Sequence, residues 1–188
     1  MNHNILIITG DGGESYEAWY AYHRFLEEGD KPVVAAPSKR QLHLVIHDFE
    51  QGWDTYIERK GYGMESQMTI DEAKEEDFDA ILILGGRAPE YLRHNQTLLR
   101  LVQQFHQKEK WVFAICHGTQ VLINAGLAEG NCLTCYEHVR SEVERNGGTY
   151  STNEAVRDKN IVTAQTWQSH PEFYREVFSC LKENEIPY

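Results

Sequence analysis

A cysteine and a histidine stand side by side in the segment AICHGTQ, as Cys116 and His117. The thiolate is the nucleophilic form of cysteine, and a neighbouring imidazole can take the thiol proton as a general base. Adjacent residues on a regular helix do not face each other, so this pair can act together only on an irregular turn. A free cysteine is also commonly a small buried apolar residue. The pair is therefore a candidate nucleophile and base, with local packing as the competing interpretation.

The residues around this pair predict a sharp turn between a strand and a helix. The apolar run WVFAIC (111–116) is typical of a buried strand, HGTQVLINAG (117–126) is typical of a helix, and Gly118 permits a tight turn. In a doubly wound sheet, active sites collect at the carboxyl ends of the strands, where such a turn would lie. The N-terminus of the helix would favour the thiolate form of Cys116.

Two other segments place candidate site residues at strand ends. Gly85 and Gly86 close the run LILGG, and the backbone N–H groups of Gly86 and His117 form the predicted oxyanion hole. Glu17 follows the first apolar run, on a helix, and a carboxyl group there can hydrogen-bond to the sulfur and tune its ionisation. Taken alone, such a glutamate is more commonly a solvated carboxylate.

The spacing of apolar residues predicts alternating strands and helices. Strands are expected over 4–10, 31–37, 79–86, 111–116 and 160–165, and helices over 15–30, 95–110, 117–126, 136–148 and 169–185. This alternation predicts an α/β fold with a mostly parallel sheet covered on both faces, in one domain over 1–188. Residues 41–73 differ and predict one or two hairpins at the sheet edge. Trp53, Tyr56 and Tyr62 in this region are expected either to cover that edge by local packing or to form a subunit contact.

Composition narrows the classes of function. The net charge is −11 and no basic block is present, which argues against nucleic acid as a partner. No apolar run reaches membrane-spanning length and the first residues do not resemble a signal peptide, so no membrane association and a cytoplasmic location are expected. Cys132 and Cys135 form a C-x-x-C pair without further ligands at metal-site spacing, so no metal or other cofactor is expected. Dithiol chemistry at that pair is a minor alternative.

The motifs together resemble those of a known family. GGRAPEYL followed by AICHG is similar to the PfpI-type intracellular proteases, within a superfamily that includes the Parkinson-disease-associated deglycase. The helix EAWYAYHRFLEEG, the segment NGG and the final strand and helix are also similar, so the resemblance covers nearly the whole chain. It implies a flavodoxin-like three-layer α/β/α sandwich with a nucleophilic cysteine on the strand-to-helix turn.

The resemblance also assigns residues. It implies that Cys116 is the nucleophile with His117 beside it, that Glu17 contacts the thiol, and that Glu90 of GGRAPE is the third member of a triad. In that family the third residue comes from an adjacent subunit, which implies a homo-oligomer, a dimer or a hexamer, with Glu90 donated across an interface. The chain departs from the family pattern at TCYEHV, so Tyr136 and His138 are expected to line a different pocket.

Three functions are compatible with these residues. The leading hypothesis is a cysteine-dependent hydrolase of an electrophilic carbonyl, as a protease, an amidase, a deglycase or a glyoxalase-like enzyme. A small buried pocket would favour small carbonyl compounds and an open cleft would favour peptides. The alternative is a redox or stress-sensing protein or chaperone with an oxidisable Cys116. A third hypothesis uses SHPEF, where His170 and Glu172 resemble the His-x-Glu of class I glutamine amidotransferases, although His117 is not the residue type found on their turn.

Overall fold

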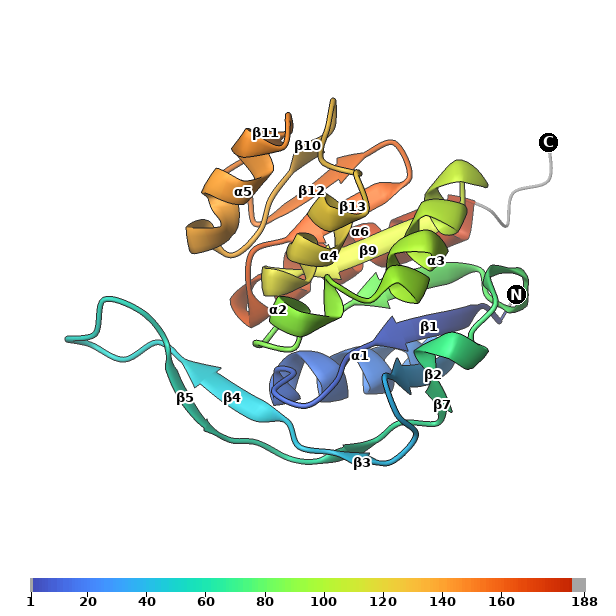
Figure 1. Cartoon of the computed structure of the whole chain (residues 1–188), viewed down its shortest axis with the longest axis horizontal. Coiled ribbons are helices and arrows are strands. Elements are labelled where there is room, and N and C mark those ends of the chain that lie inside the picture. The colour runs from blue at the N-terminus through green and yellow to red at the C-terminus, as the bar shows by residue number, and fades with distance from the viewer. Residues whose placement is uncertain (1, 184–188) are drawn as a thin grey trace.

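A seven-stranded sheet forms the centre of the molecule in the computed structural model, which describes residues 2–183 (Figure 1). Six strands run parallel, and only the edge strand β12 is antiparallel to its neighbour β13. In spatial order the strands are β12 (Ala155–Asp158), β13 (Ile161–Ala164), β9 (Trp111–Ile115), β8 (Ala80–Ile83), β1 (Asn4–Ile8), β2 (Lys31–Ala36) and β7 (Met68–Thr69). The predicted mostly parallel sheet is confirmed.

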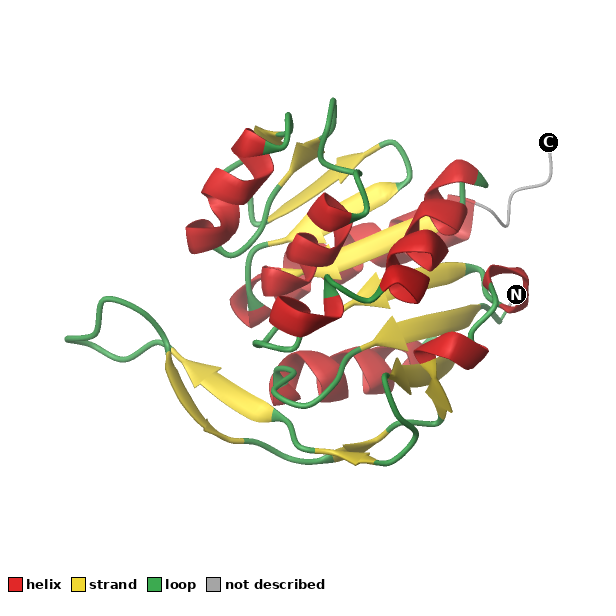
Figure 2. Ribbon diagram, in the orientation of Figure 1, coloured by secondary structure: helices red, strands yellow, loops and turns green. Residues whose placement is uncertain are grey.

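Helices cover both faces of this sheet, which gives the predicted three-layer sandwich (Figure 2). α1 and α6 lie together on one face, where the rings of Tyr20 and Tyr174 are 5.2 Å apart. α3 and α4 lie on the other face (Figure 1). The α-helices are α1 (Ser15–Glu27), α2 (Pro89–Leu92), α3 (Gln96–Gln107), α4 (Thr119–Asn124), α5 (Arg140–Arg145) and α6 (His170–Glu183).

The strand order places a binding site between β1 and β8. The order β2-β1-β8-β9-β13 is the flavodoxin-like order 2-1-3-4-5. The chain changes direction across the sheet between β1 and β8, and ligands bind at the carboxyl ends of the strands at such a point. Ile8 pairs with Ile83 and Ile83 pairs with Ala114, so β1, β8 and β9 end at the same edge.

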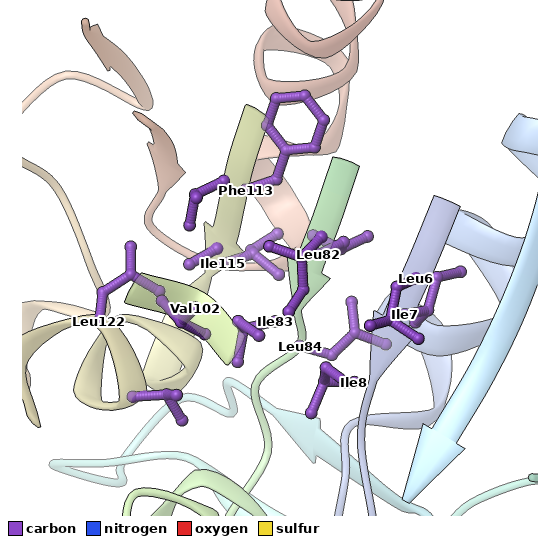
Figure 3. Close-up of a cluster of buried hydrophobic side chains, with 14 of the residues drawn as sticks. Leu6, Ile7, Ile8, Leu82, Ile83, Leu84, Val102, Phe113, Ile115 and Leu122 are labelled. Atoms are coloured by element: carbon purple, nitrogen blue, oxygen red, sulfur yellow. The ribbon is translucent and has the colours of Figure 1, made fainter. Parts of the chain in front are cut away.

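The core fixes the positions of these strand ends. Every residue of β8, β9 and β13 is buried, as expected for parallel strands covered on both faces. In Figure 3, Ile83 and Ile115 lie beside Val102 of α3 and Leu122 of α4. Full burial of each such side chain contributes about 1.5–3 kcal/mol to folding. The residues that follow these strands therefore start from rigid positions.

Residues 41–65 form a long antiparallel arm beyond the sheet edge, which confirms the predicted hairpin (Figure 1). We call this segment the hairpin arm. Within it, β3 (Gln41–Leu42) pairs with β6 (Met64–Glu65), and β4 (Val45–Asp48) pairs with β5 (Ile57–Lys60). After the arm, β7 adds to the sheet as an edge strand. Among the arm's large side chains, Trp53 and Tyr62 are exposed in this chain, whereas Tyr56 is half-buried.

The short elements differ from the sequence-based expectations. The predicted helix over 136–148 is a 3₁₀ turn over Glu137–Val139 followed by the six-residue α5, and the one over 117–126 is reduced to α4 after a 3₁₀ turn. β12 and the small parallel pair of β10 (Cys132–Leu133) and β11 (Thr149–Tyr150) were not predicted. Elements this short depend on tertiary pairing more than on sequence period. The predicted end of the last helix, 184–185, lies outside the described residues.

Within residues 2–183, no helix is long and apolar enough to cross a membrane.

Candidate active site

Three of the predicted site segments meet at one edge of the sheet. Cys116 directly follows β9, Gly85 and Gly86 follow β8, and Glu17 lies on α1, which follows β1. β1, β8 and β9 are neighbours in the sheet, so their carboxyl ends bring these residues together. This edge coincides with the point where ligands bind in flavodoxin-like folds.

Cys116 occupies a strained position on the predicted sharp turn. Its φ is +59°, a left-handed conformation that non-glycine residues rarely adopt and that is concentrated at functional sites. The 3₁₀ turn Cys116–Gly118 connects β9 to α4. A Cβ atom at Gly118 would lie 2.4 Å from the carbonyl oxygen of Ile83, so only glycine lets the turn approach the neighbouring strand this closely. The turn therefore has the geometry of a nucleophile elbow.

The irregular turn lets Cys116 and His117 face each other. The Cys116 Sγ and His117 Nδ1 atoms are 3.3 Å apart, within hydrogen-bonding distance for sulfur. Burial, with smaller contributions from His47, His138 and Arg93, lowers the pKa of His117 to about 4. The imidazole is therefore neutral near pH 7 and its Nδ1 atom can accept the thiol proton. The two side chains are therefore in contact, and their roles as nucleophile and base stay a prediction.

Glu17 is fully buried, which excludes the solvated carboxylate considered from sequence. Its Oε2 atom accepts a hydrogen bond from the Gly85 N–H at 2.6 Å. Burial raises the pKa of Glu17 well above its ordinary value, and the nearby Glu14 raises it further, although the Gly85 N–H and a hydrogen bond with Cys116 lower it. We therefore treat the Glu17 carboxyl as protonated near pH 7 and able to donate a hydrogen bond to the sulfur.

Gly85 makes this contact between Glu17 and Cys116 possible. A Cβ atom at position 85 would lie 2.6 Å from the Cys116 Cβ and 2.8 Å from the Glu17 Oε2 atom. Either contact is shorter than real Cβ atoms allow, so any side chain at Gly85 would separate the carboxyl group from the thiol.

The N–H groups at the turn favour the thiolate, as expected from the sequence, but burial of the sulfur outweighs them. Cys116 is only 6% exposed, and burial raises the pKa of its thiol well above the ordinary value. The backbone N–H groups of His117 and Gly86 lower the pKa in opposition. α4 is only six residues long, so its dipole is small. The site instead holds a thiol whose proton His117 can accept as the sulfur reacts.

The predicted oxyanion-hole donors lie beside the sulfur. The N–H groups of Gly86, which follows β8, and of His117, which follows β9, both donate toward Cys116. Gly86 has a φ of +76°, and a Cβ atom there would lie 2.4 Å from the Glu14 nitrogen and the Gly12 oxygen. Only glycine at position 86 therefore lets the chain after β8 pass this close to Gly12 and Glu14. Stabilisation of an oxyanion by this pair stays a prediction.

Glu90 lies apart from the pair. It is exposed on α2, and within residues 2–183 its side chain makes no hydrogen bond with His117. Its negative charge nevertheless contributes to raising the pKa of the nearby Tyr56. Glu90 is thus on the surface around the site, and its role as the third member of a triad stays a prediction.

Tyr136 and His138 lie at different depths. Tyr136 is buried, its ring centroid is 4.8 Å from that of His117, and its N–H contacts the Cys116 carbonyl oxygen at 3.5 Å. His138 is exposed, and its ring meets the edge of Tyr136 at 5.1 Å. Tyr136 packs against His117, whereas His138 lies at the surface beside Tyr136, and their lining of a substrate pocket stays a prediction.

The structure adds residues from the hairpin arm that sequence reasoning did not assign to the site. The ring of Tyr56 is 5.8 Å from that of His117 and stacks on His47 at 4.0 Å. His47 Nε2 is 3.0 Å from Glu58, which also binds Arg87 of the GGRAPE motif. A histidine and a tyrosine were visible in IHDFEQGWDTYIE, but no sequence signal fixed how the arm folds back toward the strand ends.

A second buried carboxyl group lies next to Glu17. Glu14 precedes α1 as its N-cap and accepts a hydrogen bond from the Glu17 N–H at 2.6 Å. Its other oxygen accepts from the His47 N–H at 3.4 Å. Burial raises the pKa of Glu14 to about 7. Glu14 therefore connects the start of α1 to the hairpin arm.

The alternative triad of His170 and Glu172 is not assembled. His170 is buried against the ring of Tyr20, at 4.3 Å, and neither of its ring nitrogens has a hydrogen-bond partner among the described residues. Glu172 is bound to Arg175 instead. The amidotransferase-like arrangement is therefore not supported.

The other cysteines do not extend the site. Cys132, Cys135 and Cys180 are free, and burial raises the pKa of Cys135 and Cys180 to about 12. Across residues 2–183, no group of three or more His, Cys, Asp or Glu side chains is arranged to hold a metal ion.

Comparison with known proteins agrees with this site and fold. The family model described as the DJ-1/PfpI family matches residues 3–179. The chain is 35% identical over 187 residues to Protein DJ-1 homolog D of Arabidopsis thaliana, covering 96% of this chain and 48% of that relative, and so spans about half its length. It is 32% identical over 178 residues to Deglycase PH1704 of Pyrococcus horikoshii, covering 95% of this chain and 99% of that one.

A solved structure supports the fold independently. The ThiJ/PfpI domain protein of Brachyspira murdochii matches with a TM-score of 0.84 at 22% identity and covers 99% of both chains. At this identity the likeness shows the fold alone. The family suggested by GGRAPEYL and AICHG is confirmed by the family match and by relatives that align over nearly all of the chain: this protein belongs to the DJ-1/PfpI family.

Proposed function

We propose that this protein is a Cys116-dependent hydrolase of small electrophilic carbonyl compounds, with deglycase-like or glyoxalase-like activity. The observation that carries the proposal is the 3.3 Å contact between the Cys116 Sγ and the neutral His117 Nδ1 atoms on a strained turn. A nucleophile held against its base in this way is the arrangement that covalent catalysis requires. The deglycase name of the Pyrococcus horikoshii relative supports the same class of reaction.

The geometry suggests how the first step proceeds. The Cys116 sulfur forms a bond to the carbonyl carbon, the thiol proton moves to His117 Nδ1, and the carbonyl π electrons move to the oxygen. The N–H groups of Gly86 and His117 would donate hydrogen bonds to that oxygen and stabilise its developing negative charge. His117 then returns the proton to that oxygen, which gives a hemithioacetal. In a 2-oxoaldehyde a proton moves from C1 to C2 through an enediol, so the hemithioacetal becomes a thioester of the 2-hydroxy acid. Water cleaves the carbon–sulfur bond of the thioester and releases the acid and the thiol, so the net reaction consumes one water and no oxidant.

Burial of the nucleophile favours small substrates over peptides. Cys116 is 6% exposed and His117 is 8% exposed, with Tyr136 packed against the histidine. An extended peptide needs an open cleft to bring its carbonyl carbon to the sulfur. Hydrolysis of 2-oxoaldehydes, or of their adducts on amino groups, requires only a small opening.

The redox-sensing alternative has less support. An oxidisable sensor cysteine is accessible and has a lowered pKa. In this chain Cys116 is buried, and burial raises the pKa of its thiol. Peroxide titration followed by mass spectrometry would favour the sensor only if Cys116 were oxidised selectively in a protein that turns over no carbonyl substrate.

Parallel assays of one preparation test the proposal. We expect turnover of methylglyoxal, or release of a methylglyoxal adduct from N-acetylarginine, to exceed cleavage of a casein-derived peptide by at least about a hundredfold in kcat/KM, since each ~1.4 kcal/mol of differential barrier gives a factor of ten. Cys116→Ser supplies the background for each assay. Peptide cleavage faster than either carbonyl reaction would overturn the preference for small substrates.

A further inference from the structure

The hairpin arm contributes one wall of the active-site entrance. The ring of Tyr56 lies 5.6 Å from that of Tyr136 and 5.8 Å from that of His117, while Tyr136 and His117 are 4.8 Å apart. These three rings form a continuous aromatic surface beside Cys116, which we call the aromatic slot. Burial raises the pKa of Tyr56 to about 12, and Cys116 is the next contributor, so the phenol stays protonated and lies within electrostatic reach of the sulfur.

Contacts on the arm hold Tyr56 in a fixed position. His47 stacks on its ring with an interplanar angle of 23°. The His47 ring is fixed in turn by Glu58, whose carboxylate also accepts hydrogen bonds from the Arg87 side chain at 3.0 and 3.1 Å. The His47 carbonyl oxygen accepts from Trp167 Nε1 at 2.9 Å, so the arm is attached to two separate loops at the strand ends.

The tip of the arm packs against the Tyr136 side of the slot. Thr55 Oγ1 and the Tyr136 hydroxyl are 3.5 Å apart, and the ring of Phe49 lies 6.3 Å from that of Tyr136. A separate cavity of about 130 Å³ lies between the arm tip and Tyr136, and neither Tyr56, His117 nor Cys116 lines it. The approach to the sulfur is therefore bounded by the three rings themselves, and it leaves Cys116 only 6% exposed.

We propose that Tyr56 is the residue that sets substrate size, because its ring, fixed on the hairpin arm, narrows the aromatic slot to the width of a small carbonyl compound. The inference rests on the proposed function, and it adds the residue that enforces the preference for small substrates. His47 is a positioning residue, since it acts by holding the Tyr56 ring and does not itself line the slot with His117.

The rate at which alkylating reagents of different size reach the Cys116 thiol reports the width of the aromatic slot. This measurement needs no enzymatic turnover. The alkylation rate of the Cys116 peptide is followed by mass spectrometry with iodoacetamide as the small reagent and fluorescein maleimide as the bulky one. Tyr56→Ala should raise the ratio of the bulky to the small rate by about tenfold, which corresponds to a barrier lowered by about 1.4 kcal/mol. Tyr56→Trp should lower the same ratio, so the test does not depend on a single variant.

Two controls separate size selection from general loosening of the arm. Tyr56→Phe keeps the ring and should leave the ratio within about twofold of wild type, a difference of ~0.4 kcal/mol. Tyr62→Ala removes a tyrosine that is 79% exposed on the same arm, and it should also leave the ratio within about twofold of wild type. An unchanged ratio in Tyr56→Ala, or an equal rise in Tyr62→Ala, would overturn the assignment. Because the readout is alkylation, the result stands whether or not methylglyoxal is turned over.

Discussion

Mixing two nearly inactive variants, Cys116→Ala and Glu90→Ala, should restore roughly a quarter of wild-type activity if Glu90 completes the site of a neighbouring chain. In this chain Glu90 is exposed on α2 and does not bind His117 among the described residues, so its carboxylate is available to another subunit. The basis for donation across an interface is the resemblance of GGRAPE to the family motif. The expected oligomer is itself a proposal.

The expected quarter follows from symmetry. In a two-fold pair the contact is isologous, so each chain gives one Glu90 and receives one. After the variants are unfolded and refolded together, about half of the pairs are mixed, and each mixed pair holds one intact site of two. The other site in the pair lacks both residues. Activity is measured as methylglyoxal turnover, with pairing confirmed by native mass spectrometry.

A matched control uses residues that must come from one chain. Cys116 and His117 are adjacent, with Sγ and Nδ1 3.3 Å apart, so a mixture of Cys116→Ala with His117→Ala contains no intact site and should regain nothing. Recovery of activity in that control would mean that the activity regained by mixing Cys116→Ala with Glu90→Ala does not come from sharing Glu90. No recovery with Glu90→Ala, despite confirmed mixed pairs, would place Glu90 in its own chain's site, and full activity of Glu90→Ala alone would place it outside the site.

Replacing the buried Glu17 by glutamine should change how stability depends on pH. Burial raises the pKa of Glu17 well above 4.5, so the folded state keeps the proton at pH values where the unfolded state has lost it. The stability that this neutral carboxyl contributes is fully present below pH 4.5 and is lost as pH rises toward the folded-state pKa. Over that window the loss is up to about 1.4 kcal/mol per pH unit.

The variant Glu17→Gln removes this titration while its amide oxygen can still accept the Gly85 N–H. Relative to wild type, its melting temperature should therefore rise steadily between pH 5 and pH 8. Glu14, whose pKa is raised to about 7, contributes a slope of the same sign in both proteins and cancels in the comparison. Two outcomes would show that Glu17 is ionised in the folded state. Either the difference in melting temperature between the two proteins stays constant from pH 5 to pH 8, or the melting temperature of wild type rises relative to that of the variant.

Much of the architecture is predictable from the sequence because parallel strands leave a strong pattern. NILIITG, DAILILGG and WVFAIC are short, continuous apolar runs, and each corresponds to a fully or almost fully buried strand. The residues that follow them are Gly85 and Cys116, whose place at the strand ends follows from the topology alone. The apolar runs predict the strands, and the residues that follow those runs predict which edge of the sheet holds the candidate site.

The rest depends on tertiary contacts that the sequence does not display. Glu17 stands on a helix whose exposed and buried faces both carry polar residues, and only the approach of Gly85 shows that its carboxyl group is buried. Tyr56 is far from Cys116 along the chain, and its position depends on how the hairpin arm folds back. The sequence shows the turn that favours a Cys116 thiolate, but it does not show the burial that raises the pKa of the thiol.

The central claim, that carbonyl hydrolysis runs through Cys116, is tested most directly by comparing the fraction of Cys116 alkylated with the fraction of activity lost. Iodoacetamide is added in steps, the Cys116 peptide is quantified by mass spectrometry, and methylglyoxal turnover is measured on the same samples. The two fractions should rise together with a slope of about one, and substrate should slow both, because one thiol serves each site. Full turnover in protein whose Cys116 is completely alkylated, or loss of activity that follows modification of Cys132 instead, would contradict the account.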